Sequence, residues 1–190
     1  MAFNAVLAIT LCDAGAPRRS FVHPKQLLKN FRDCKIAYLA IPPRFSDPDT
    51  HFSNTTLTID HLRESKEKLI WASYMARFFG SKVAIRHFDY RDGALRMRWQ
   101  NNMRYVDKVF GGLNLEYTAG VLAGSELGNP DIEAIKKEDV GLFITLVADQ
   151  RDRDLGDLFV KRPELRVIEN ERLIPVLLLN QRDDLYVLCD

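Results

Sequence analysis

Leu142-Phe143-Ile144-Thr145-Leu146-Val147 is an apolar run that leads through a polar loop to Arg162-Pro163, a short helical stretch, and Ile174-Pro175-Val176-Leu177-Leu178-Leu179-Asn180. The order is strand, loop, helix, strand. A near-continuous apolar run is typical of a strand whose sheet is covered by helices on both faces. The stretch therefore predicts the end of an α/β domain.

A similar stretch stands near the start of the chain. Val6 to Thr10 is followed by a polar loop, a helical stretch that opens at His23-Pro24, and the apolar run from Lys35 to Pro42. It begins almost at Met1, whereas the second copy has a full domain in front of it. We therefore expect a tandem arrangement in which the first unit is incomplete.

Two prolines align the copies. Pro24 lies 12 residues before Ile36, and Pro163 lies 11 residues before Ile174, so the copies match with one gap. The sequence thus predicts that the last strands of the two units are equivalent.

Composition bounds the class of protein. The chain has 190 residues, of which 46% are hydrophobic, and a formal net charge of +1. This length suits one packed domain or slightly more. A net charge near zero supplies no overall field that would gather nucleic acid or a membrane, so we expect neither as a partner. Cys12, Cys34 and Cys189 are an odd, widely spaced set rather than a disulfide framework, which favours a cytoplasmic location.

A linker divides the chain. Residues 42–49 contain three prolines among polar residues, so we expect no regular structure there. We assign residues 1–43 to the partial strand-helix-strand unit, residues 44–54 to the linker and residues 55–190 to a complete domain.

Strands and helices alternate in the larger domain. Strands are expected at residues 56–59, 82–88, 113–121, 141–147 and 176–179. Helices are expected at residues 65–79, 94–110, 131–138 and 164–170. This alternation predicts a three-layer α/β/α fold around a parallel five-stranded sheet with right-handed crossovers.

The first of these helices has the clearest pattern. Ser65 is its expected N-cap and Gly80 its stop. Its buried side is predicted from apolar and small residues at three- and four-residue spacing: Leu69, Ala72, Ser73, Ala76 and Phe79.

Four segments carry a resemblance to a known family. They are Thr56-Leu57-Thr58-Ile59-Asp60, Ser65 to Ala72, Gly141-Leu142-Phe143-Ile144 and Ile174-Pro175-Val176-Leu177-Leu178. In this order they resemble the first strand, first helix, fourth strand and final strand of the universal stress protein (UspA) family. The resemblance implies the sheet order 3-2-1-4-5 of the adenine nucleotide alpha hydrolase-like fold, and a non-catalytic regulatory or interaction role in stress response.

The resemblance also raises the question of a nucleotide. Family members that bind ATP carry G-x2-G-x9-G-[S/T] after the fourth strand, where small glycines let backbone N–H groups approach phosphates. Here residues 148–157 lack the two leading glycines and contain Asp149, Asp152, Asp154 and Asp157. We therefore predict that ATP is not bound. The alternative is a sensor of ATP or AMP, because Asp60 matches the family residue that hydrogen-bonds adenosine.

Other chemistry finds little support in the pattern. His23, His51, His61 and His87 have no metal-ligand spacing, so no metal site is expected. A hydrolase-like enzyme would need a nucleophile motif that the sequence lacks, so no catalytic residue is assigned. Basic and aromatic residues between positions 86 and 108 could bind single-stranded nucleic acid, but Trp99 falls on the buried stripe of its helix.

The resemblance predicts how the units associate, since family members pair through their last strands. The expected association residues are Tyr38, Leu39 and Ile41 in the first unit and Val176, Leu177 and Leu178 in the second. The pairing can occur within one chain, as an internal pseudo-dimer, or in a homodimer. Val6 to Thr10 would then form an apolar sheet edge, which we expect either a symmetric homodimer or the missing segment of a longer natural protein to cover, and we favour the dimer.

Overall fold

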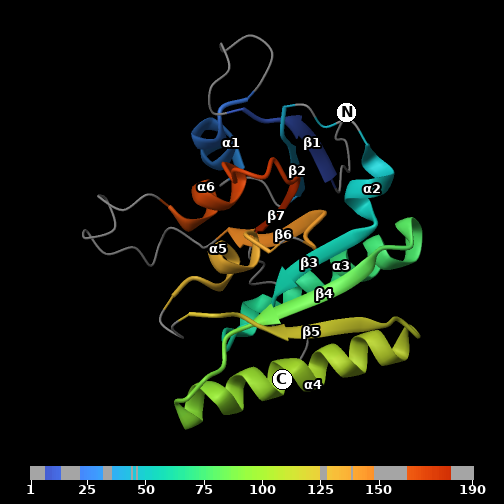
Figure 1. Ribbon diagram of the computed structural model, residues 1–190, viewed down its shortest axis with the longest axis vertical. Helices are drawn as coiled ribbons and strands as arrows, with labels where there is room; N and C mark the ends of the chain where they lie inside the picture. The colour runs from blue at the N-terminus through green and yellow to red at the C-terminus, as the bar shows by residue number, and fades with distance from the viewer. Residues whose placement is uncertain are drawn as a thin grey trace.

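The structure, a computed structural model, describes residues 7–13, 22–31, 36–43, 45, 47–124, 128–137, 139–147 and 162–180. Within these ranges seven strands form one sheet in the order β1-β2-β7-β6-β3-β4-β5 (Figure 1). The strands are β1 (Leu7–Leu11), β2 (Ala37–Ile41), β3 (Asn54–Thr58), β4 (Lys82–His87), β5 (Tyr117–Val121), β6 (Leu142–Val147) and β7 (Val176–Asn180). The helices are α1 (Pro24–Phe31), α2 (Pro48–Phe52), the 3-10 helix η1 (Arg63–Glu67), α3 (Lys68–Phe79), α4 (Gly93–Gly112), α5 (Pro130–Ala134) and α6 (Pro163–Ile168).

The larger unit has the predicted topology. Its strands follow the spatial order β7-β6-β3-β4-β5, and each neighbouring pair among them is parallel. Numbered within the unit, this is the order 3-2-1-4-5 read from the β5 edge. The α/β fold class expected from the sequence is therefore confirmed.

The first unit extends the same sheet. β1 is parallel to β2, and β2 is antiparallel to β7, so the sheet is mixed rather than purely parallel. β1 and β5 are its two edges. The partial unit and the larger unit thus share one continuous sheet in the described residues.

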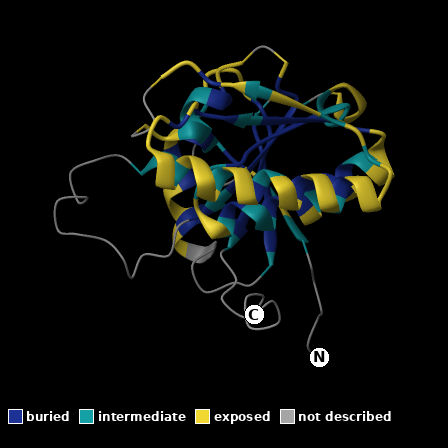
Figure 2. Cartoon of the chain, turned by 90° about the horizontal axis from the view of Figure 1, so that it is seen from below, coloured by how far each residue is buried: buried dark blue, intermediate teal, exposed yellow. Residues whose placement is uncertain are grey.

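Helices cover both faces of the sheet. Buried side chains of α1, α5 and α6 pack on one face, and those of α3 and α4 pack on the other. Successive strand residues alternate between these two cores, as Phe143 and Ile144 show. Both faces are apolar for this reason, which explains the unbroken apolar runs in the sequence. Figure 2 shows buried strands between helices whose outer sides are exposed.

The linker prediction needs a correction. α2 begins at Pro48 inside the segment expected to be irregular, because Asp47 caps it by accepting a hydrogen bond from the backbone N–H of Thr50 at 3.2 Å. Proline is well tolerated at the first position of a helix, since its missing N–H has no partner there. α5 starts in the same way, with Asn129 as its N-cap and Pro130 at its first position.

The predicted N-cap of the first long helix is wrong. Ser65 lies inside η1, where its hydroxyl donates to the carbonyl oxygen of Leu62 at 2.9 Å, and α3 itself begins at Lys68. Phe79 is also wrongly placed on the buried side, since it is exposed and packs on Phe52 of α2. Gly80 ends the helix as predicted, with a φ of 63° that favours glycine. Among the described residues, no helix is long and apolar enough to cross a membrane.

Candidate functional site

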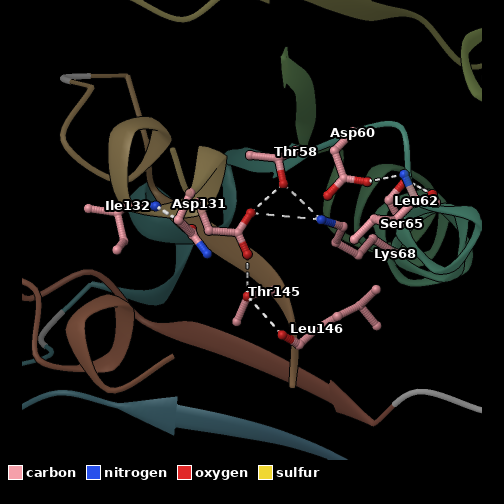
Figure 3. Close-up of polar contacts among 10 residues, drawn as sticks. Thr58, Asp60, Leu62, Ser65, Lys68, Asp131, Ile132, Thr145 and Leu146 are labelled. Carbon is pink, nitrogen blue, oxygen red and sulfur yellow. Dashed lines mark hydrogen bonds and ion pairs between the residues drawn. The ribbon is translucent and has the colours of Figure 1, made fainter. Parts of the chain in front are cut away.

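The order in which strands are added to the sheet reverses between the parallel neighbours β3 and β6. β3 continues through α3 toward β4, whereas β6 continues through α6 toward β7 on the other side, and the two helices lie on opposite faces. In open α/β sheets, ligands bind outside the carboxyl ends of the strands at such a switch point. The polar side chains gathered there are the candidate site (Figure 3).

An ion pair between a buried lysine and an aspartate whose side chain is 14% exposed occupies the centre of this site. Lys68 Nζ donates to Thr58 Oγ1 at 2.8 Å and lies 3.8 Å from Asp131 Oδ1. The hydroxyl of Thr58 donates to Asp131 Oδ1, and that of Thr145 donates to Asp131 Oδ2. Both carboxylate oxygens and the ammonium are therefore engaged by groups of the same chain.

Four separate elements of the chain build the network. Thr58 ends β3, Thr145 lies in β6, and Asp131 lies in the first turn of α5, which packs against β3. Lys68 is the first residue of α3 and only 3% of its side chain is exposed. A buried lysine is costly unless it is paired, so the pair depends on both partners being present.

Asp60 lies next to this network. It follows β3 and its Oδ1 accepts a hydrogen bond from the backbone N–H of Leu62 at 2.8 Å. Burial raises the pKa of the Asp60 carboxyl, and the nearby Lys68 ammonium opposes that rise. Asn102 of α4 donates to the carbonyl oxygens of Asp60 and Leu62, both at 2.8 Å, and so holds the loop after β3 in place.

The described part of the site carries more negative than positive charge. Two carboxylates, those of Asp60 and Asp131, accompany the single ammonium of Lys68. Sites for phosphate normally present free backbone N–H groups or excess positive charge. The described residues hold no cluster of three or more His, Cys, Asp or Glu that could hold a metal ion.

Aromatic rings fill the neighbouring region at the carboxyl ends of β3 and β4. The ring of His61 packs edge-on against Tyr90 at 5.5 Å, and His87 packs against Trp99 at 4.4 Å. Tyr90 and Trp99 are 6.3 Å apart, which joins the two pairs. The ring of Trp99 thus packs against other side chains of the chain, in agreement with its predicted position on the buried stripe of α4.

The same fold occurs in solved proteins. A universal stress protein from Archaeoglobus fulgidus DSM 4304 matches with a TM-score of 0.65 at 15% identity, over 95% of this chain and 63% of its own. The chain has the universal stress protein fold. A functionally unknown protein from Pseudomonas aeruginosa PAO1 matches with a TM-score of 0.58 at 14% identity, over 96% of this chain and 65% of its own.

A third match is one domain of a transporter. The cytoplasmic domain of a prokaryotic cation chloride cotransporter matches with a TM-score of 0.57 at 12% identity, over 95% of this chain and 67% of its own. The chain spans less than two thirds of the Archaeoglobus protein. No protein-family model matches the sequence, and no curated protein matches it significantly.

The structure describes some of the predicted site residues but not all of them. Asp60 lies at the carboxyl end of β3, at the edge of the switch point. The loop of residues 148–157, on which the prediction about ATP rested, lies outside the described residues. Lys68 and Asp131 were missed, although Lys68 is spaced with Ala72 and Met75 on the sheet-facing side of α3. A lone lysine on that stripe was the available signal.

The predicted association strands lie side by side. Tyr38 is opposite Leu178, Leu39 is opposite Leu177, and Ala40 is opposite Val176. The two last strands therefore meet within one chain, in the antiparallel sense.

Proposed function

We propose that this chain is a universal stress protein-like regulatory or interaction protein in stress response, which catalyses no reaction and holds no ATP at its switch point. The observation that carries the proposal is the buried pair of Lys68 and Asp131. Its polar atoms are engaged by Thr58 and Thr145, so the groups that could serve a substrate are tied to one another.

The pair also disfavours a nucleotide. An approaching triphosphate would have to displace Asp131 from Lys68 or remain beside two carboxylates. Displacing it would leave a buried aspartate without its cation, which costs several kcal/mol. The rings of His61, Tyr90 and Trp99 further occupy space next to Asp60.

An interaction role is supported by the way the two units meet. The antiparallel contact of β2 with β7 is what an internal pseudo-dimer of two equivalent units requires. We propose that the chain uses this contact to complete its own sheet, in a tandem arrangement with an incomplete first unit. The fold also occurs as the cytoplasmic domain of a cotransporter, so it can serve as one domain within a larger protein.

The second candidate is a sensor of ATP or AMP. The observation in its favour is that Asp60 and Lys68, an acceptor and a cation, lie close together at the switch point. If Asp131 moved away from Lys68, the ammonium would become free to meet a phosphate. Both candidates involve the same site. In the first, the chain's own side chains fill it, and in the second a nucleotide does.

Calorimetry with ATP and AMP separates the two candidates, together with chromatography of any nucleotide released on denaturation. We expect no stoichiometric site at micromolar affinity and no rise in melting temperature, since a ligand of the native state must raise it. A stoichiometric nucleotide would refute the first candidate. If that site were lost in Asp60→Ala but kept in Asp49→Ala, an exposed aspartate in α2, the sensor would be the correct assignment.

A further inference from the structure

Ile9 and Ile144 occupy equivalent positions but differ in burial. Ile9 is paired with Leu39 of β2, and Ile144 is paired with Leu177 of β7. Leu39 and Leu177 are equivalent in the alignment of the two copies, and so are Ile9 and Ile144. Yet Ile9 is 66% exposed, whereas Ile144 is fully buried in the core beneath α3.

The difference arises because the first unit has no counterpart of α3 among the described residues. α3 packs over β3 and β6, and its buried residues meet Ile144. Leu11, which points to the same face as Ile9, is 51% exposed. β1 therefore presents an apolar strip of one strand where the second unit presents a helix.

A second apolar surface lies on the outer side of α3. Ile70, Tyr74 and Phe78 recur every four residues and are all exposed, with Phe78 exposed to 72%. They stand opposite the residues of α3 that face the sheet, among them Leu69 and Ala72. We call Ile70, Tyr74 and Phe78 the α3 stripe.

The α3 stripe and the strip on β1 lie on the same side of the sheet. Leu7, Ile9 and Leu11 share a face with Ala37, Leu39 and Ile41, which belong to the core on the α3 side. Those three residues of β2 are buried, so the uncovered part of this face is the strip of β1 at the edge of the sheet. β2 and β7 lie between that strip and the strands under α3.

We propose that a second copy of this chain covers this surface, with α3 of each copy lying on β1 of the other about a twofold axis. Such a contact is self-complementary, because each copy supplies one helix stripe and one strand strip. The two α3 helices would lie side by side between two sheets. Each would pack on its own sheet with one side and on the partner's β1 with the other.

The size of the apolar surface suits a specific dimer. The exposed parts of Ile9, Leu11 and the α3 stripe offer roughly 600 Å² per copy, given that a large apolar or aromatic side chain exposes roughly 150–250 Å². A twofold contact that covered all of this surface would remove at most about 1,200 Å² from water, which is the lower limit of stable interfaces. The dimer is therefore expected to be in equilibrium with monomer at accessible concentrations.

Sedimentation equilibrium of the whole chain over a wide concentration range tests the proposal. We expect a monomer-dimer equilibrium whose dissociation constant rises roughly tenfold or more in Ile9→Lys and in Phe78→Glu, because each buries a charge in the contact. The matched controls are Val121→Lys on the opposite sheet edge, which is 62% exposed, and Met97→Glu on α4, which is 61% exposed. Both should leave the equilibrium unchanged.

Disulfide trapping tests the geometry. An equal mixture of Ile9→Cys and Tyr74→Cys chains should form a mixed crosslinked dimer on mild oxidation, beyond the background that the native cysteines give in the parent chain. Crosslinking of Ile9→Cys only to itself would indicate edge-to-edge pairing of β1 and would overturn the proposal. A parent chain that stays monomeric, because another segment covers β1, would overturn it too, and so would a dimer that neither Ile9→Lys nor Phe78→Glu weakens.

Discussion

Leu39 of β2 lies directly opposite Leu177 of β7, and this pair marks a local twofold axis of the sheet. The neighbouring pairs, Tyr38 with Leu178 and Ala40 with Val176, are exchanged by that axis. The alignment of Ile36 with Ile174 makes Tyr38 equivalent to Val176 and Ala40 equivalent to Leu178. The register is therefore the one that two equivalent strands adopt when they pair symmetrically.

Because of this register, we expect the stability effects of substitutions at Leu39 and Leu177 to be coupled. Both are buried in the core on the α3 side, so Leu39→Ala and Leu177→Ala should each cost about 2–5 kcal/mol of unfolding free energy. Residues directly opposite in an antiparallel pair are coupled. The double variant should therefore deviate from additivity by about 0.5 kcal/mol or more in denaturant titrations. Ile135→Ala, in the core on the other face, is the control and should add to Leu39→Ala independently. Strict additivity of Leu39→Ala and Leu177→Ala would show that the two strands are not in contact.

The ion pair at the switch point predicts unequal effects of single and double substitutions. Lys68→Met leaves Asp131 buried without a cation, and Asp131→Leu leaves the Lys68 ammonium without an anion. Each should cost about 3–5 kcal/mol in unfolding free energy. The double variant removes both charges and should be less destabilised than either single variant, as read from urea midpoints. A double variant whose loss equals the sum of the two single losses would contradict a paired network. Arg86, whose partner Asp139 is exposed, offers a control, because Asp139→Asn should cost far less than Asp131→Leu.

The central strands were predictable because their physics is local. Leu142 to Val147 is apolar along its whole length, and both faces are covered, so composition alone marks it as a buried parallel strand. The order of the strands followed from the family resemblance rather than from composition. The helix caps at Asn129 and Gly80 were predictable for a similar reason, since each is fixed by its own backbone.

The candidate site was not predictable in this way. Lys68, Asp131 and Thr145 are far apart in the sequence, and nothing near any of them shows that they meet at one point. Phe79 was misplaced because the helical stripe was continued up to Gly80, whereas its ring contacts Phe52 of α2 and stays exposed. The α2 helix was missed because prolines were taken as breakers where Pro48 is in fact the first residue of a capped helix.

Phe143 and Phe78 form a matched pair for testing which apolar residues hold the fold. Phe143 is fully buried in β6, so Phe143→Ala should cost about 3–5 kcal/mol in unfolding free energy. Phe78 is largely exposed, so Phe78→Ala should change stability by at most about 0.5 kcal/mol. Both values come from denaturant midpoints measured at low protein concentration, where association does not contribute. A loss below about 1 kcal/mol for Phe143→Ala would show that β6 is not central.

Asp60 predicts a pH dependence of stability with a defined sign. Burial raises its pKa in the folded chain, so above the unfolded value of about 3.9 the native state holds more protons than the unfolded chain. Stability contributed by this group therefore falls as pH rises from about 3.9 through the raised pKa. Asp60→Asn keeps an acceptor for the N–H of Leu62 but cannot ionise. It should gain stability relative to the parent as pH rises from about 4 to 7, as measured by urea midpoints.

Asp47 provides a control of opposite sign for Asp60. A hydrogen bond from the Thr50 side chain lowers the pKa of the Asp47 carboxyl, so its ionised form stabilises the cap of α2. That stability is present above the unfolded pKa and is lost as pH falls through the lowered value. Asp47→Asn should therefore lose stability relative to the parent as pH rises toward about 4, and its difference from the parent should then stay nearly constant up to about pH 7, where Asp60→Asn gains. If Asp60→Asn also changed only below about pH 4, the burial of Asp60 would not be what sets its ionisation, and its place beside Lys68 at the switch point would have to be revised.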